Sequence, residues 1–282
     1  IYTCLVVGSV DVYKRQVLME SSKKLFLLDA YALIYRGYYA FIKNPRINSK
    51  GTDTSAILGF MNSLLEIIRT QNPDYIAVAF DKGGSITRSE MFTEYKSNRD
   101  KTPEPILVAI PYIKEILNSM NISILEKEGY EADDIIGTVA KDAEKNNFKV
   151  YMVTPDKDFA QLVSDNIFLC KPARMGNSME IWGVDEVKER FEVDSPEQVI
   201  DYLGMMGDSV DNIPGLPGVG DKTAKKFIKE YGNLETLLEN SHEIKGKLGE
   251  KIADNKELGI LSKKLARIIL DVPVKYKLTD LS

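Results

Sequence analysis

Histidine and cysteine are almost missing from this chain of 282 residues, which has one histidine, His242, and two cysteines, Cys4 and Cys170. Two cysteines can form neither a disulfide framework nor a four-ligand zinc site, so we expect a reducing compartment, the cytoplasm. With a single histidine, mechanisms that need a histidine base or a histidine–cysteine pair are nearly excluded. Any chemistry must therefore depend on carboxylates, lysine, arginine, hydroxyl groups and a bound metal.

Long apolar segments are also missing, because no run approaches the ~18 to 20 residues that a membrane helix needs. We therefore expect no membrane partner. The length and a hydrophobic share of 44% suffice for one large or two modest folded domains. The balance of 37 basic against 42 acidic residues gives a net charge of −5, which is unusual for a protein that binds nucleic acid.

Residues 1–22 are expected to be a non-native or disordered leader. Between Ile1 and Leu18 the charged residues follow the apolar part, which is opposite to their order in a signal peptide. Met19 is placed like a natural start. The fold is therefore inferred from residue 23 onward.

Short apolar runs alternate with amphipathic segments along the first part of the chain. This alternation predicts an α/β fold, with a mostly parallel central sheet and helices on both faces. The expected strands are Leu25 to Leu28, Tyr75 to Phe80, Ile122 to Leu125 and Phe148 to Val153, and the expected helices are 54–69 and 131–145.

Acidic residues stand at or just after the ends of three of these strands. Asp29 and Asp81 end two of them, and Asp156 and Asp158 follow a third. In sheets of this kind, ligands bind beyond the carboxyl ends of the strands. Glu131, Asp133 and Asp134 open a helix that can reach the same crevice.

Any single one of these acids could simply cap a helix or face solvent. The set is harder to explain in that way, because carboxylates crowded together repel one another unless a cation holds them. Divalent ions with oxygen ligands, Mg²⁺ or Mn²⁺, are the natural partners when a phosphate completes the coordination.

The second half carries two further acids, Asp208 and Asp211, followed by a turn rich in glycine and proline. A helix is then expected over 221–231, with amides at its N-terminus and lysines along it, which suits a phosphodiester backbone. The turn has one residue too many for a P-loop and no strand leads into it. A helix-hairpin-helix that grips DNA explains it better than a plain connector. Its expected DNA contacts are Gly215, Gly218, Gly220, Lys222, Thr223, Lys225 and Lys226.

Between Asp81 and Pro103 lies a segment rich in basic and aromatic residues, including Arg88, Tyr95, Lys96 and Arg99. Cations and aromatics close to a metal cluster are typical of a surface that threads a nucleic-acid strand. Such a run can equally be a solvated helix, so alone it is weak evidence.

Taken together, the motifs are collinear with those of a known family. From about Lys23 to Val274 the chain resembles the 5′-nuclease domains of bacterial DNA polymerase I, in the flap endonuclease superfamily. The resemblance is carried by LLDAYALIYR, VAFDKG, EYKSNRD, GYEADD, TPDKD, GDSVDNIPG and GVGDKTA.

The resemblance implies a PIN-like nuclease core over 23–192 with an arch over 82–103, a helix-hairpin-helix subdomain over 193–274, and a linker or tail over 275–282. It implies catalytic roles for Lys96, Arg99 and Arg88, a DNA contact for Tyr95 beside them, and a K⁺ ion at the turn. It also implies two divalent metal ions, held by nine carboxylates: Asp29, Asp81, Glu131, Asp133, Asp134, Asp156, Asp158, Asp208 and Asp211. These nine acids outnumber the excess of five negative charges, so the rest of the chain is net basic.

The activity implied is metal-dependent 5′-3′ exonuclease and 5′-flap endonuclease cleavage of DNA and of RNA primers, by a cytoplasmic, nucleoid-associated monomer. Two departures stand out: Thr87 and Ser89 replace the usual arch residues around Arg88, and no polymerase domain follows Ser282. Either the chain is a fragment or the nuclease acts alone. The rivals are a PIN-type RNA nuclease and an inactive DNA-junction binder. A haloacid-dehalogenase phosphatase would need an acid where Tyr31 stands.

Overall fold

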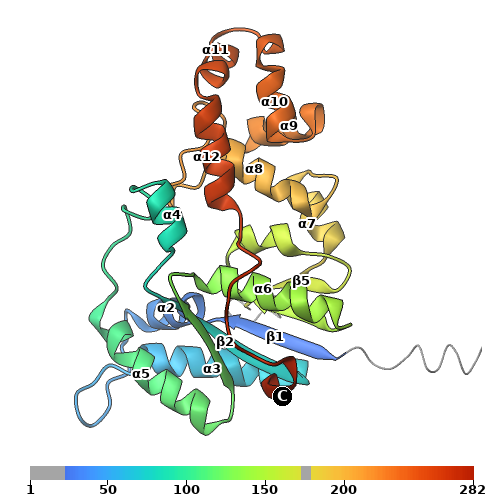
Figure 1. Ribbon diagram of the computed structural model, residues 1–282. Helices are drawn as coiled ribbons and strands as arrows, with labels where there is room; N and C mark the ends of the chain where they lie inside the picture. The colour runs from blue at the N-terminus through green and yellow to red at the C-terminus, as the bar shows by residue number, and fades with distance from the viewer. Residues whose placement is uncertain (1–22, 173–178) are drawn as a thin grey trace, which may run out of the picture.

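A six-stranded sheet forms the centre of the protein (Figure 1). The computed structural model describes residues 23–172 and 179–282, and its strand order is β3–β2–β1–β4–β5–β6. Neighbouring strands are parallel except β5 and β6, which are antiparallel. The predicted α/β fold is therefore confirmed. The strands are β1 Lys24–Asp29, β2 Tyr75–Lys82, β3 Ser123–Glu128, β4 Lys149–Val153, β5 Ile167–Lys171 and β6 Glu180–Trp182.

Both faces of the sheet are buried, because successive strand residues point to opposite sides. Phe26 and Leu28 of β1 pack with helices α2, α3 and α5, whereas Leu25 and Leu27 pack with α6 and the helical half of the chain. An apolar run such as Leu25 to Leu28 is therefore a central strand with both faces covered. The core helices are α2 Ala30–Phe41, α3 Ser55–Gln71, α4 Ile86–Met91, α5 Glu104–Ser119, α6 Ala132–Lys145 and the 3₁₀ helix η1 Lys157–Leu162.

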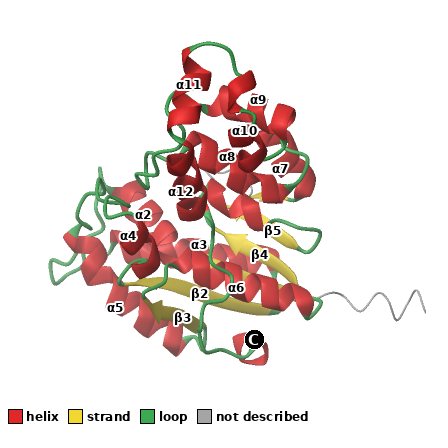
Figure 2. Cartoon of the chain, turned by 45° about the horizontal axis from the view of Figure 1, so that its top comes forward, coloured by secondary structure: helices red, strands yellow, loops and turns green. Residues whose placement is uncertain are grey.

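The second half is helical and shares one hydrophobic cluster with the α6 side of the sheet. Figure 2 shows these helices grouped away from the strands. They are α7 Val184–Phe191, η2 Pro196–Gln198, α8 Val199–Met206, α9 Asp221–Tyr231, α10 Leu234–Glu239, η3 Ser241–Glu243, α11 Lys247–Asp254 and α12 Lys256–Ala266. Among the described residues no helix has both the length and the apolar character needed to cross a membrane.

The predicted helices match closely. The helix expected over 54–69 is α3, that over 131–145 is α6, and that over 221–231 has the bounds of α9. Sequence patterns did not reveal α5, which follows the arch segment. The leader expected over 1–22 lies outside the described residues.

The C-terminal segment 267–281, here called the strap, runs back from α12 across α6 to the sheet. Its end, η4 Leu278–Leu281, buries Leu281 almost completely, and Ser123 on β3 donates a hydrogen bond to the Asp280 carbonyl. Residues 275–282 were expected to be a linker or tail, but they pack on the core.

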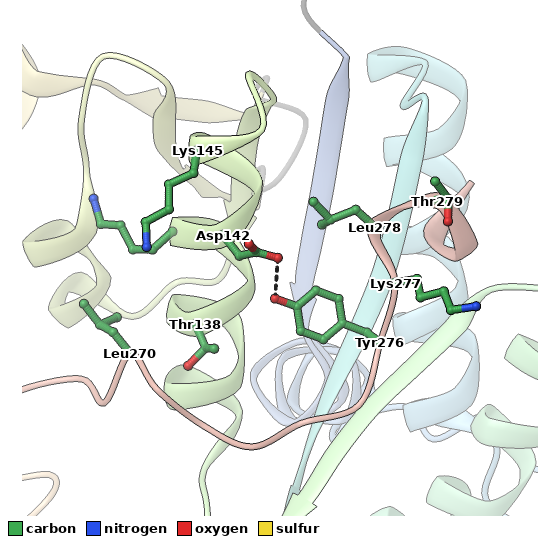
Figure 3. Close-up of a pocket in the computed structure, with 9 residues that line it drawn as sticks. Thr138, Asp142, Lys145, Leu270, Tyr276, Lys277, Leu278 and Thr279 are labelled. Atoms are coloured by element: carbon green, nitrogen blue, oxygen red, sulfur yellow. Dashed lines mark hydrogen bonds between the residues drawn. The ribbon is translucent and has the colours of Figure 1, made fainter.

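A cavity of about 640 Å³ lies between α6 and the strap (Figure 3). Tyr276 points from the strap to α6, where its hydroxyl donates to Asp142 at 2.8 Å. Lysines dominate the charged lining, and none of the predicted site residues is among the lining residues, which are Thr138, Lys141, Asp142, Lys145, Leu270, Tyr276, Lys277, Leu278 and Thr279. This cavity is therefore separate from the acidic crevice.

Candidate active site

Neighbouring strands of the sheet bring the first acids together. Asp29 ends β1, and the strands on its two sides are β2, which carries Asp81, and β4, which leads through Thr154 to Asp156. Asp29 accepts hydrogen bonds from the Ala32 amide at 3.1 Å and from the Thr154 hydroxyl at 3.0 Å. Asp29 therefore caps α2 and also faces the crevice, so its role as a helix cap is compatible with a role in the site.

The N-terminus of α6 is joined to the end of β2. Asp81 accepts a hydrogen bond from the Ala132 amide at 2.7 Å. Glu131 is the residue that caps α6, and Glu131, Asp133 and Asp134 each offer a carboxylate oxygen within 4.8 Å of the others. The positive end of the helix dipole favours acids at this position, but it does not cancel the repulsion among three of them.

Crowding and burial leave these carboxylates short of compensating charge. Burial, followed by the charge of Asp81, raises the pKa of Asp29 to about 7. Burial is also the main cause that raises the pKa of Asp81, Asp133, Asp156 and Asp158. Oδ1 of Asp158 is buried and has no hydrogen-bond partner among the described residues. A divalent cation would supply the missing charge and a partner for this oxygen, so the donor set fits Mg²⁺ or Mn²⁺.

Two glycines place the remaining acids, Asp208 and Asp211, beside this cluster. Gly207 and Gly215 both have positive φ, 75° and 64°, and a Cβ on Gly215 would lie 2.5 Å from the Gly207 nitrogen. Only glycine allows the two backbones to approach this closely. The loop between them is closed by backbone hydrogen bonds between Asp208 and Ile213.

The arch residue Lys96 lies directly on the acidic cluster. Its Nζ is 2.7 Å from Glu131 and 3.4 Å from Asp211, and Arg99 also pairs with Asp211. Burial lowers the pKa of Lys96, but the nearby carboxylates of Glu131, Asp211 and Asp133 outweigh it and raise the pKa overall. Both cations therefore remain charged in the crevice.

Tyr95 and Arg88 are placed differently from the expectation. The Tyr95 ring is buried, and its hydroxyl donates to Glu131 at 3.0 Å, so it offers no face for stacking on a base. Arg88 is 2% exposed and forms a bidentate pair with Asp134, which is 0% exposed. Arg88 cannot reach a phosphate in this conformation, and the Asp134 oxygens are engaged by protein groups.

The expected DNA-gripping turn begins at the buried Gly215, beside the loop that carries Asp208 and Asp211, and becomes exposed at Gly218, Gly220 and the start of α9. Gly220 caps α9, and Gly218 has a φ of 88°. Lys222 and Lys226 are exposed, whereas Lys225 pairs with Asp221 at 3.2 Å. Thr223 and Gly215 belong to the same turn and first helical turn.

Several residues that support the site carry no recognisable sequence signal. The Thr154 hydroxyl holds Asp29, and amides from Asn98 and Asn212 tie the arch to the 208–212 loop. Lys157, at 3.7 Å from Asp208, lies between two predicted ligands in the sequence, and this spacing could have drawn attention to it.

The chain matches two family descriptions in order along its length. Residues 24–192 match "5'-3' exonuclease, N-terminal resolvase-like domain", and residues 194–282 match "5'-3' exonuclease, C-terminal SAM fold".

Among curated relatives, DNA polymerase I of Bacillus subtilis (strain 168) is 42% identical over 93% of this chain and 30% of its own length. A 5'-3' exonuclease of Aquifex aeolicus (strain VF5) is 38% identical over 92% of this chain and 86% of its own length. The chain thus spans about 30% of the polymerases it matches but most of the separate exonuclease.

Solved structures share the fold at low identity. A T5 5'-exonuclease with bound zinc ions has a TM-score of 0.71 at 23% identity, covering 86% of this chain and 89% of its own. The catalytic core of Rad2 in complex with DNA substrate has a TM-score of 0.58 at 20% identity, covering 92% and 83%. These likenesses support the α/β core with an attached helical part.

Proposed function

Because this chain belongs to the 5′-3′ exonuclease family, we propose that its acidic crevice hydrolyses DNA phosphodiester bonds with the help of two divalent metal ions. The observation that carries the proposal is the convergence of carboxylates from β1, β2, α6, η1 and the 208–212 loop at one edge of the sheet. Five separate segments deliver acids to one place, where basic side chains such as Lys96 and Arg99 offset only part of the repulsion, and divalent cations would offset the rest.

Eight carboxylates would hold the ions: Asp29, Asp81, Glu131, Asp133, Asp156, Asp158, Asp208 and Asp211. A bound pair of ions supplies a hydroxide nucleophile at neutral pH and charge compensation for an in-line displacement. The Thr154 hydroxyl donates to Asp29 and the Ala132 amide donates to Asp81, and these hydrogen bonds fix the orientation of the two carboxylates. We propose Mg²⁺ or Mn²⁺ as the bound ions.

Lys96 and Arg99 would bind the scissile phosphate. Both are cationic, both reach the crevice from the arch, and Arg99 is half exposed. A phosphate entering beside Glu131 and Asp211 would take over their ion pairs. Cations directed at the transferring phosphate stabilise the charge that develops on it.

The proposed substrate is DNA with a 5′ end or 5′ flap, including an RNA primer–DNA hybrid. The exposed turn and α9 present amides, Lys222 and Lys226 for phosphodiester contacts that carry no sequence information. A K⁺ ion at this turn is part of the same proposal. The DNA polymerase I relatives support a polymerase domain attached in the full protein. A cytoplasmic, nucleoid-associated location and a monomeric state are further parts of the proposal.

The test compares Asp133→Asn and Asp208→Asn with Asp254→Asn, which changes an exposed acid on α11. With Mg²⁺ and a labelled 5′-flap substrate, we expect both crevice variants to lose cleavage by about 100-fold or more, while DNA binding persists. The α11 variant should cleave like the wild type. Equal loss of binding and cleavage in the crevice variants would contradict the proposed metal roles.

A substrate panel decides between DNA junctions and RNA. The wild type should cut the 5′-flap DNA and a primer hybrid faster than hairpin RNA. Preference for the hairpin would instead support a PIN-type RNA nuclease, and binding without any cleavage under Mg²⁺ or Mn²⁺ would support an inactive junction binder.

A further inference from the structure

Arg88 makes contacts with three different segments and exposes almost none of its surface. Its Nε donates to the Leu265 carbonyl at 3.0 Å, and Nη2 donates to the Arg267 carbonyl at 2.9 Å. Nη1 donates to Glu131 at 3.0 Å, and both terminal nitrogens donate to Asp134, at 2.8 and 2.7 Å. One guanidinium thus joins α4 to the start of α6 and to the end of α12.

Asp134 is engaged as fully as its partner. Besides Arg88, its Oδ1 accepts from the Ile269 amide of the strap at 2.8 Å, and its Oδ2 accepts from the Glu131 amide at 3.4 Å. Its exposed fraction is 0%, whereas the side chain of its neighbour Asp133 is 27% exposed. Of two adjacent acids on one helix, Asp133 opens toward the crevice and Asp134 faces protein.

The same side of α6 holds the strap over two further turns. The Val272 amide donates to Thr138 at 3.2 Å, and Tyr276 donates to Asp142 (Figure 3). Asp134, Thr138 and Asp142 are spaced four residues apart, so they lie on one helix face. Gly137 lies beneath the strap, where an added Cβ would come within 2.9 Å of Ile268 and Leu270. Asp134 is the end of this row that meets the metal cluster.

From these contacts we infer that Arg88 and Asp134 form a positioning pair that holds Glu131 and Asp133 in place, rather than a phosphate contact and a metal ligand. To bind a metal, Asp134 would have to give up its bidentate pair with Arg88, which would leave the buried guanidinium with only Glu131 at 3.0 Å and Asp133 at 3.9 Å, and breaking a buried pair is destabilising. Through the Leu265 and Arg267 carbonyls, the pair also links the end of α12, in the proposed DNA-gripping half, to the acidic cluster.

This inference deepens the proposed function and rests on its metal site, so the first test separates the two. Asp134→Asn, Arg88→Met and Asp133→Asn are melted in EDTA and again in saturating Mg²⁺. In EDTA, Asp134→Asn and Arg88→Met should melt roughly 10 °C below the wild type, because each breaks a buried ion pair. Asp133→Asn should melt at or above the wild type, because it relieves repulsion.

The rise in melting temperature with Mg²⁺ then shows which of the two acids binds the metal. The melting temperature of Asp134→Asn should still rise with Mg²⁺, while Asp133→Asn should lose most of that rise. If Asp134→Asn lost the rise as Asp133→Asn does, Asp134 would be a metal ligand and the inference would be wrong. If Asp133→Asn kept the full rise, the metal site would be misplaced, yet the melting temperatures in EDTA would still decide the role of the pair.

A kinetic test distinguishes positioning from mere stability. At a temperature where every variant is folded, the positioning role predicts that kcat of Asp134→Asn at saturating Mg²⁺ falls roughly 10- to 100-fold, with KM for the flap substrate changed little. Arg88→Lys should have a kcat as low as that of Arg88→Met, because one ammonium group cannot replace the planar set of guanidinium donors. Full kcat in the folded Asp134→Asn protein would overturn the inference.

A double variant measures the coupling between Arg88 and Asp134. Arg88→Met combined with Asp134→Asn should lose clearly less than the sum of the two single losses in melting temperature, because the second change removes a partner that is already unpaired. Additive losses would show that the two side chains act independently. If Asp134→Asn failed to fold in EDTA while Asp133→Asn folded, Asp134 would be shown to hold the fold without metal, and Arg88→Met would then decide the positioning role: a lowered kcat with little change in KM supports it, and full kcat overturns it.

Discussion

The acidic crevice and the exposed turn with α9 serve the same proposed reaction but are built in opposite ways. The crevice is assembled from acids that lie more than a hundred residues apart, several of them with a raised pKa because they are buried. The turn and helix 215–231 are formed by consecutive residues, and Lys222 and Lys226 on them are exposed. Because the crevice is assembled from distant segments, its acids are buried at low dielectric and interact strongly with one another, which favours catalysis. The turn is built from neighbouring residues, so its exposed lysines would make weak, independent contacts that suit DNA binding.

The largest contrast is expected between Lys96 and Lys226. Because Lys96 lies among buried carboxylates, its removal should cost kcat about 10²- to 10³-fold, with little change in DNA affinity. Single-turnover cleavage of a flap substrate by Lys96→Ala, with binding measured separately in Ca²⁺, provides the check. If affinity alone changed, Lys96 would be a tether for the strand, and the two regions would not differ in the way described.

Stability of the metal-free crevice should depend on pH. The pKa of Asp29, about 7 in the folded protein against an ordinary 3.8, means that the unfolded chain loses this proton first as pH rises. The stabilising contribution is therefore complete below about pH 4 and is lost as the pH rises through 7. For this group alone the loss is at most about 4 kcal/mol.

Urea unfolding in EDTA between pH 4 and 8 measures this loss. The wild type should become less stable toward pH 8, Asp29→Asn should show a smaller slope, and Mg²⁺ should flatten the slope by favouring the carboxylate. If the dependence of unfolding free energy on pH were unchanged in Asp29→Asn, the loss of stability would come from the other buried acids. Asp254→Asn, which changes an exposed acid on α11 outside the crevice, serves as the control and should keep the wild-type slope.

The smallest effect is expected at the turn. Lys226→Ala should weaken DNA binding a few-fold and reduce the slope of log affinity against log salt by about 1, with kcat unchanged. Fluorescence anisotropy at several salt concentrations provides the measurement. A loss of kcat larger than the loss of affinity would show that the turn is coupled to the crevice more tightly than its exposed position implies.

Much of this molecule can be predicted from patterns in its sequence. Continuous apolar runs predict buried parallel strands, and the rule that ligands bind beyond strand ends locates Asp29, Asp81 and Asp156. Helix α9 was predicted with its observed bounds, because its glycine turn, its N-terminus and its lysines are all local features. Helix and strand propensity and the period of apolar residues depend only on residues close together in the chain, so they can be recognised without a structure.

Tertiary contacts decided what neighbouring residues do. Asp133 and Asp134 are indistinguishable by residue type and adjacency, yet one opens to the crevice and the other is buried against Arg88. The burial of Tyr95 and the packing of the strap across α6 likewise depend on groups far along the chain. The sequence thus specified which acids end strands or open helices, because the period of apolar residues is local. The order of the strands and the partner of each side chain depend on contacts that exist only once the chain has folded.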